Sequence, residues 1–123
     1  MPAEFRVDAH KGVVFTTAWG VLSTEDVLAG REVLGNDPQF LPDMKQLIDM
    51  RGVTAALAHA EVKSLALSDP FVTGARRAVV APGDLAFGVM RQYAAYLFNK
   101  AVVPEVFRGL DEACEWLGID CPE

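Results

Sequence analysis

The chain has 123 residues, of which 51% are hydrophobic and 23% are charged, and its formal net charge is −6. A chain of this length and composition is expected to fold as one domain with a real core, which excludes a disordered chain. The acidic balance argues against a nucleic-acid partner, because phosphate binding needs a face rich in Lys and Arg.

The apolar stretches of the sequence are far shorter than the ~20 residues that cross a bilayer. The first residues lack the basic start and apolar run of a signal peptide. We therefore expect a single domain, residues 1–123, in the cytoplasm and with no membrane span.

The first elements read as an antiparallel hairpin. Residues 5–10, FRVDAH, alternate apolar and polar side chains with the period of a half-buried strand. Lys11 and Gly12 form a turn, and residues 13–19, VVFTTAW, are rich in β-branched and aromatic residues. Polar side chains on one face predict a sheet whose helices lie mainly on the other.

A helix is predicted from Ser23 to about Leu34. Ser23 is a good N-cap, and Asp26 three residues later can complete a capping box. Residues 45–50, KQLIDM, then form a short apolar third strand, and residues 51–57 are predicted to be a loop. In this interpretation Asp49 and Arg51 stand where a buried strand ends.

The second half alternates helices and strands. A helix over residues 58–67 ends at Ser68-Asp69-Pro70, and AVVAP forms a fourth strand. The longest helix is expected over residues 84–99. A fifth strand, VVPEVF, contains Pro104 and should therefore lie at a sheet edge.

An amphipathic helix over LDEACEWL, with Gly118 as its stop, closes the chain. The order is β-β-α-β-α-β-α-β-α. Strands that alternate with helices should pair in parallel, so the fold class is a single α/β domain with a mixed five-stranded sheet.

Four phrases of the sequence, in this order, resemble the STAS-like family related to the sporulation anti-anti-sigma factor, in its uncharacterised SpoIIAA-like branch. They are the opening hairpin before GVLSTED, then DPQFLPDMKQLIDMRGV, RRAVVAPGDLAFGVMRQY and VFRGLDEACEWLG, which together span about residues 5–118. The resemblance implies a bacterial protein with helices packed on a mixed sheet. It implies a fold more than an activity, and members of this branch also resemble a lipid-binding fold.

The resemblance also points to the end of the third strand. In true anti-anti-sigma proteins the following loop carries an Asp-Ser pair, and a partner kinase phosphorylates the serine. The corresponding residues here are Asp49-Met50-Arg51-Gly52, so the serine is missing, and Thr54 does not match the motif. The phosphorylation switch is therefore not carried over.

No catalytic residue is predicted. Asp49 has no clear titrating partner for acid–base work, and the alternative is that it accepts backbone N–H groups or pairs with Arg51. The serines, Ser23, Ser64 and Ser68, lie outside any GxSxG motif. The glycines form neither of the phosphate-binding motifs GxGxxG and GxxxxGK[ST]. We expect no enzyme activity.

No metal or cofactor is predicted either. The two cysteines form no CxxC pair, and the two histidines are far from them in sequence. Cys114 is at a core-like helical position, and Cys121 is interpreted as a free thiol. The helix that begins at Asp84 offers N–H groups to an anion, but the Asp84 side chain would itself cap them.

The long helix has more apolar surface than one stripe requires. One stripe contains Phe87, Met90, Ala94 and Leu97, and a second contains Leu85, Val89, Tyr93 and Tyr96. Three explanations remain open: simple burial, an interface between two copies of the chain, and a pocket for an apolar ligand.

The leading hypothesis is a non-enzymatic STAS-like regulatory domain that binds protein partners and forms a homodimer through the long helix. The alternative is a small carrier or sensor for an apolar or lipid-like ligand under that helix. The residues expected at the partner or ligand surface are Asp49, Arg51, Asp84, Val89, Tyr93 and Tyr96.

Overall fold

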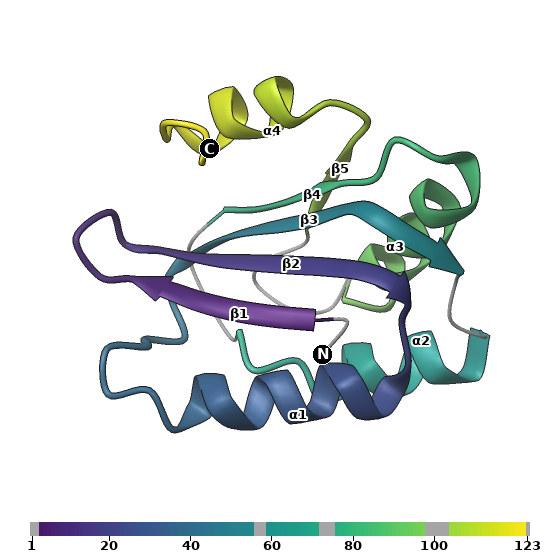
Figure 1. The fold of residues 1–123 in the computed structure, drawn as a ribbon, viewed down its shortest axis with the longest axis horizontal. Helices are drawn as coiled ribbons and strands as arrows, with labels where there is room; N and C mark the ends of the chain where they lie inside the picture. The colour runs from purple at the N-terminus through teal and green to yellow at the C-terminus, as the bar shows by residue number, and fades with distance from the viewer. Residues whose placement is uncertain (1–2, 56–58, 72–75, 98–103, 123) are drawn as a thin grey trace.

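The protein is described here by a computed structural model that covers residues 3–55, 59–71, 76–97 and 104–122. One five-stranded sheet carries four helices in the described parts of the chain (Figure 1). In chain order the elements are β1 (Ala3–Asp8), β2 (Val13–Val21), α1 (Thr24–Gly35), β3 (Lys45–Ala55), α2 (His59–Leu67), β4 (Arg77–Val80), α3 (Asp84–Tyr96), β5 (Glu105–Phe107) and α4 (Leu110–Leu117). The predicted element order is confirmed.

The strands lie side by side in chain order, β1-β2-β3-β4-β5. β1 pairs antiparallel with β2, and the other neighbours pair in parallel, so the sheet is mixed as predicted. β5 is an edge strand, in agreement with Pro104 directly before it.

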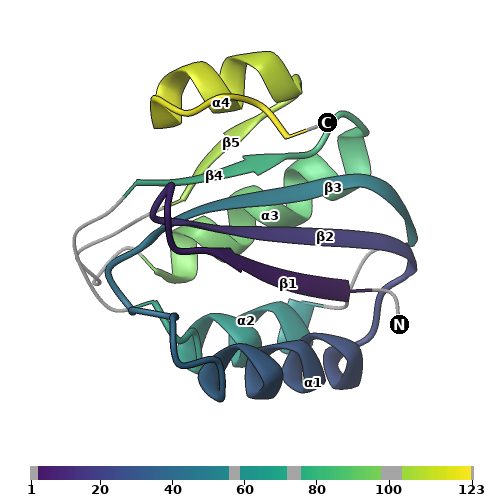
Figure 2. The ribbon, with the colours of Figure 1, turned by 60° about the vertical axis from the view of Figure 1, so that its left-hand side comes forward.

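Alternation along the strands divides the core between two faces of the sheet. Phe15, Leu47 and Val80 pack with α4, whereas Ile48 and Val79 pack with α2 and α3 on the opposite face. Figure 2 shows α4 alone on one side, with α1 and α2 across the sheet from it. Three helices therefore cover the second face, as the hairpin pattern indicated.

Two helix ends follow the sequence signals. Ser23 accepts a hydrogen bond from the backbone N–H of Asp26, whose carboxylate accepts from the backbone N–H of Ser23, which is a complete capping box. Gly118 ends α4 with φ +72°, in the left-handed region that glycine adopts without strain. α3 ends at Tyr96, and predicted helix residues 98 and 99 lie outside the described part of the chain.

The predicted end of the third strand is wrong. β3 runs on through residues 51–55 and pairs with Trp19, Gly20 and Val21 of β2, with two irregularities in the register. A side chain at Gly52 would place its Cβ 2.9 Å from the Cβ of Trp19, so glycine permits this close pairing. Asp49 and Arg51 consequently lie within a strand.

The prediction of a free thiol at Cys121 is also wrong. Cys114 and Cys121 form a disulfide that ties the end of α4 to the residues after it. Sequence spacing gave no warning, because the two cysteines meet only when Gly118 turns the chain back. Among the described helices, none is long and apolar enough to cross a membrane.

Candidate functional site

A cavity lies between the sheet and the three helices of its second face. The volume inside it that is open to water-sized groups is about 80 Å³. Side chains from β1 to β4 and from α1, α2 and α3 line it, together with Leu22 and residues that follow α2.

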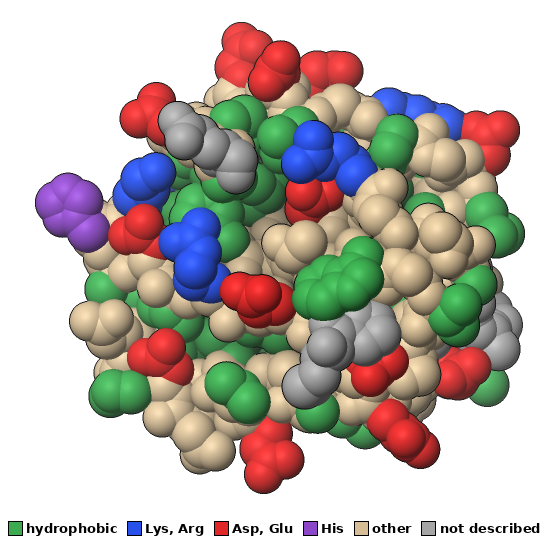
Figure 3. All heavy atoms as spheres, in the orientation of Figure 1, with side chains coloured by type: hydrophobic (Ala, Val, Ile, Leu, Met, Phe, Trp, Pro, Cys, Tyr) green, Lys and Arg blue, Asp and Glu red, His purple; other side chains and the backbone are tan. Residues whose placement is uncertain are grey.

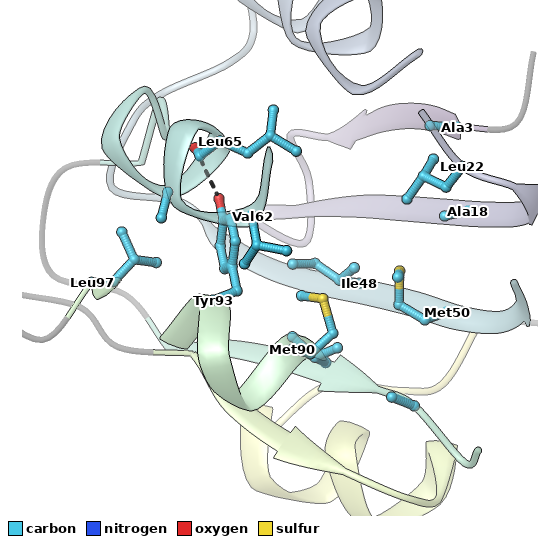
Figure 4. Close-up of a cluster of buried hydrophobic side chains, with 13 residues drawn as sticks. Ala3, Ala18, Leu22, Ile48, Met50, Val62, Leu65, Met90, Tyr93 and Leu97 are labelled. Atoms are coloured by element: carbon cyan, nitrogen blue, oxygen red, sulfur yellow. Dashed lines mark hydrogen bonds between the residues drawn. The ribbon is translucent and has the colours of Figure 1, made fainter. Parts of the chain in front are cut away.

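Most of the lining is apolar. β3 contributes Ile48, Met50 and Val53, and α3 contributes Val89 and Met90. Figure 4 shows Ile48 and Met50 on β3 opposite Met90 of α3, with Leu22 and Ala18 farther along the sheet. The long helix therefore directs an apolar stripe into the molecule.

One end of the cavity is polar, and Asp69 is its centre. The Asp69 carboxylate accepts a hydrogen bond from Nη2 of Arg77 at 2.7 Å and another from the hydroxyl of Tyr93. It also accepts from the backbone N–H of Phe71 at 2.9 Å. Asp69 is 5% exposed and Arg77 2%, so this ion pair is shielded from water.

The network continues from Arg77 across two strands. Nε of Arg77 donates to Oε1 of Gln46 at 3.0 Å, and Nε2 of Gln46 donates to Oγ1 of Thr16 at 2.9 Å. The Arg77 guanidinium also lies 4.5 Å from the ring centre of Phe71. Among the described residues, no buried side-chain nitrogen or oxygen lacks a hydrogen-bond partner.

Arg31 approaches the same centre from α1. Its Nη1 donates to the carbonyl oxygen of Leu65 at 2.8 Å, and its Nη2 donates to the Tyr93 hydroxyl at 2.6 Å. Nη2 also lies 3.7 Å from a carboxylate oxygen of Asp69. Two guanidinium groups thus share one carboxylate at the polar end of the cavity.

Burial raises the pKa of the Tyr93 hydroxyl above its ordinary value of 10.0, and the charge of Asp69 raises it further against the opposing effect of Arg31. The phenol therefore keeps its proton at neutral pH. It can act as a donor to Asp69 while it accepts from Arg31, and it connects the two.

Of the residues predicted from sequence, Val89 and Tyr93 line this cavity. Tyr93 is only 7% exposed, so it belongs to the inner side of α3 and not to an outer face. Tyr96 is partly buried against the same hydrophobic cluster, without lining the cavity.

Asp49 and Arg51 lie apart from the cavity. Oδ1 of Asp49 accepts from the backbone N–H of Arg51, and Oδ2 accepts from Nη2 of Arg51 at 2.8 Å. Burial alone would raise the pKa of Asp49, but the hydrogen bonds and charge of Arg51 outweigh it and lower this pKa below its ordinary 3.8. The prediction that Asp49 pairs with Arg51 is confirmed, within a strand instead of a turn.

Asp84 does not cap α3, contrary to the prediction. The N-cap is Gly83, with no side-chain hydrogen bond, and the Asp84 carboxylate instead accepts from Nη1 of Arg108 at 2.5 Å. This pair is largely exposed, with 94% of the Asp84 side chain accessible. It lies outside the cavity lining.

A second groove lies where β3 ends and α3 begins, and it shares Met50, Val53, Ala55 and Ala86 with the lining of the cavity. Its lining includes Arg51, Thr54 and Leu85, and Leu85 is 65% exposed. On the face shown in Figure 3, acidic and basic side chains alternate around hydrophobic ones. Within the described ranges, no three His, Cys, Asp or Glu side chains come together as a metal site.

No family model and no curated protein matches the chain. Among solved structures, it is similar to an uncharacterised protein of the DUF3478 family from Shewanella loihica PV-4, which has a SpoIIAA-like fold. The likeness covers 94% of this chain and 91% of the other, with a TM-score of 0.60 and 18% sequence identity.

The fold is SpoIIAA-like. The resemblance found in the sequence predicted this fold, and the prediction is confirmed. At 18% identity the likeness extends to the SpoIIAA-like fold alone, so the function must be argued from the cavity.

The polar end of the cavity was not predicted from the sequence. Asp69 looked like part of a helix stop, and Arg77 looked like the start of a strand. The alternation along the strands did contain a signal. Gln46 lies two residues before Ile48, and Arg77 lies two residues before Val79, so each polar side chain points to the same inner face as its apolar neighbour. Polar side chains at such positions must find buried partners.

Proposed function

We propose that the protein is a non-enzymatic binding domain, a small carrier or sensor that takes an apolar small molecule into the cavity under α3. The observation that carries this proposal is the cavity itself. The volume inside it that is open to water-sized groups is about 80 Å³, which is room for several such groups, as a small-molecule site requires. An apolar lining with a few polar groups at one end is also typical of such sites.

Ordinary core packing is a poor explanation for this space. Protein interiors are close-packed, and unfilled apolar volume weakens the folded state. α3 carries large apolar side chains, yet the smaller side chains of Ala86 and Val89 are among those that face the cavity. A function that needs the space accounts for the loss of packing.

The position of α3 favours the ligand over the dimer predicted from the same helix. Met90, Tyr93 and Leu97 are at most 8% exposed, so the apolar stripe is already covered within one chain. Among the large apolar side chains of α3, Leu85 is the one that stays mostly exposed, at 65%.

The methionines offer a direct test. Met50 and Met90 line the cavity, whereas Met44 packs in a separate cluster with Leu34 and Phe71. Titration with 1-decanol, followed by NMR of labelled methionine methyl groups, should shift the Met50 and Met90 signals and leave the Met44 signal in place.

A cavity-filling variant supplies the control. Val89→Trp should abolish the shifts because the indole occupies the apolar end, while Ala95→Trp, at an exposed position of the same helix, should retain them. The proposal is wrong if 1-decanol shifts no cavity methionine, or if Val89→Trp binds as well as the native chain.

The groove beside Leu85 supports a second candidate, a regulatory domain that binds a protein partner or a second copy there. Exposed apolar residues next to a groove are common at interaction sites. Sedimentation at micromolar concentration should then reveal a dimer that Leu85→Glu disrupts. Val33→Glu, at an equally exposed position on α1, is the matched control, and a strict monomer would refute self-association.

We further propose a cytoplasmic location. Structural disulfides are more common in oxidising compartments, so the Cys114–Cys121 bond counts against this location and fractionation must decide it. Fractionation of bacterial cells that produce the tagged protein should recover it with the cytosol. Recovery from the periplasm or the medium would contradict the proposal.

A further inference from the structure

The cavity changes from apolar to polar in the same direction along three separate elements. Along β3 its lining passes from Val53 and Met50 to Gln46. Along α3 it passes from Ala86 and Val89 to Tyr93, and along α1 from Val27 to Arg31. Because three elements agree, the cavity as a whole has an apolar end and a polar end.

The polar end of the cavity is nearly closed to water. Gln46, Arg77 and Tyr93 are at most 7% exposed, and the Arg31 side chain is 12% exposed. We call this end the closed end of the cavity. A ligand that reaches it places one of its groups among these polar side chains.

The closed end carries a surplus positive charge. Arg31 and Arg77 are both within 4 Å of Asp69, and the described contacts place no second carboxylate in this network. Asp69 already accepts from Arg77, Tyr93 and the Phe71 backbone. A buried unbalanced charge is unfavourable, so an added anion would be stabilised there.

Donors remain for such an anion. The described hydrogen bonds of Arg31 use Nη1 and Nη2, and none uses its Nε–H. The Thr16 hydroxyl accepts from Gln46, which leaves its own proton free to donate. A cationic or amine ligand would instead require hydrogen-bond acceptors without partners. The described side chains of this network include no such acceptor.

We propose that the ligand is an amphipathic monocarboxylate, an apolar chain ending in one carboxylate, whose head group pairs with Arg31 at the closed end of the cavity. This inference rests on the proposed function and specifies its ligand class. One negative charge matches the single surplus positive charge, and a guanidinium matches a carboxylate in shape as well as in charge.

Three probes with the same ten-carbon chain test the head group: decanoate, 1-decanol and decyltrimethylammonium. Each is titrated at neutral pH, below its micelle concentration, against the Met50 and Met90 methyl signals, with Met44 as the internal reference. Decanoate should bind about tenfold or more tightly than 1-decanol, as expected for a charge-assisted hydrogen bond, and the cationic probe should bind most weakly.

Variants of Arg31 assign the effect to one residue. Arg31→Met should reduce the preference for decanoate over 1-decanol to about threefold or less, with 1-decanol affinity nearly unchanged. Arg31→Lys, which keeps the charge, should retain part of the preference. Arg91→Met, the same change at an exposed position of α3 outside the lining, should behave like the native chain.

The outcomes separate this inference from the proposed function. Equal affinity for decanoate and 1-decanol overturns the carboxylate and leaves the apolar cavity site standing. Absence of any shift at Met50 and Met90 with all three probes overturns both. A preference for decanoate that survives Arg31→Met overturns the assignment to Arg31. Comparison of the three probes on the native chain decides the ligand class even if a variant fails to fold.

Discussion

At the scale of single residues, Asp69 is the one acidic residue that is buried among those the structure describes. It is buried, it balances part of the charge of Arg31 and Arg77, and it fixes the Tyr93 hydroxyl. Local sequence could not reveal this, because its partners are 8, 24 and 38 residues away along the chain. Only the packing of α1, α3 and β4 around the end of α2 brings them together.

Asp69→Asn should therefore be strongly destabilising. The amide keeps the size of the side chain but leaves two buried guanidinium groups without a counter-charge, and breaking a buried pair costs about 3–5 kcal/mol. Urea unfolding at neutral pH measures the change in unfolding free energy. Asp43→Asn, at an exposed position, should change it by no more than about 0.5 kcal/mol. A loss below about 1 kcal/mol in Asp69→Asn would contradict this role.

The Asp49–Arg51 pair should contribute little, and in a pH-dependent manner. The side chains are 19% and 53% exposed, so solvent screening limits the pair to about 1 kcal/mol or less at neutral pH. Because the folded-state pKa of Asp49 is lowered, the contribution is present above its ordinary pKa of 3.8 and is lost as pH falls through the lower folded value.

The unfolding free energies of native chain and Asp49→Asn, measured from neutral to acidic pH, check this dependence. The difference between them should be present at neutral pH and vanish well below pH 3.8. Arg51→Gln should show the same pH dependence, since it removes the other half of the pair. A difference that grows toward acidic pH would show that Asp49 has another role.

At the scale of elements, the predictions succeeded where a boundary is set by local chemistry. The capping box at Ser23 and the glycine stop at Gly118 are both formed as expected. The end of β3 was missed because Arg51, Gly52 and Thr54 have the composition of a turn. Pairing with Trp19 to Val21 of β2 outweighs that local tendency, and this pairing is invisible from β3 alone.

α1 offers a matched pair of glycines for testing how closely it packs on β1. A Cβ at Gly30 would overlap the ring of Phe5, whereas a Cβ at Gly35 meets nothing within 4 Å. Gly30→Ala should lower the unfolding free energy by about 1–3 kcal/mol through overpacking. Gly35→Ala should raise it by up to about 1 kcal/mol through helix propensity.

Thermal or urea unfolding of both single variants distinguishes these effects. The two substitutions are chemically identical and lie in one helix, so opposite signs can come only from their surroundings. Equal changes in the two variants would mean that Phe5 moves away at little cost and that the contact between α1 and β1 is loose.

At the scale of the whole molecule, the sheet separates two sets of contacts. α4 and its hydrophobic cluster cover one face, and the cavity with its polar end lies on the other. Periodicity predicted the helices on one face of the sheet, but it did not assign α4 to the other face. The surplus apolar surface of the long helix left a ligand pocket as one of three explanations. The residues alone could not decide among these, because empty space results from how three helices are placed on the sheet and no single stretch encodes it.

This separation predicts that the disulfide supports stability without affecting ligand binding. Cys114 and Cys121 are seven positions apart, and closing so short a loop is worth about 2–3 kcal/mol in the chain-entropy model. Reduction should lower the unfolding free energy by about that amount. The affinity for 1-decanol, read from the Met50 and Met90 signals, should stay within about twofold, because α4 contributes no residue to the cavity lining.

Cys121→Ser supplies the control for the reductant. This variant should be less stable than the oxidised native chain by a similar amount, and reductant should not change it further. If reduction weakened 1-decanol binding together with stability, the two faces of the sheet would be coupled. If reduction lowered stability and left 1-decanol affinity unchanged, α4 and its disulfide would stabilise the sheet from one face without affecting the cavity on the other.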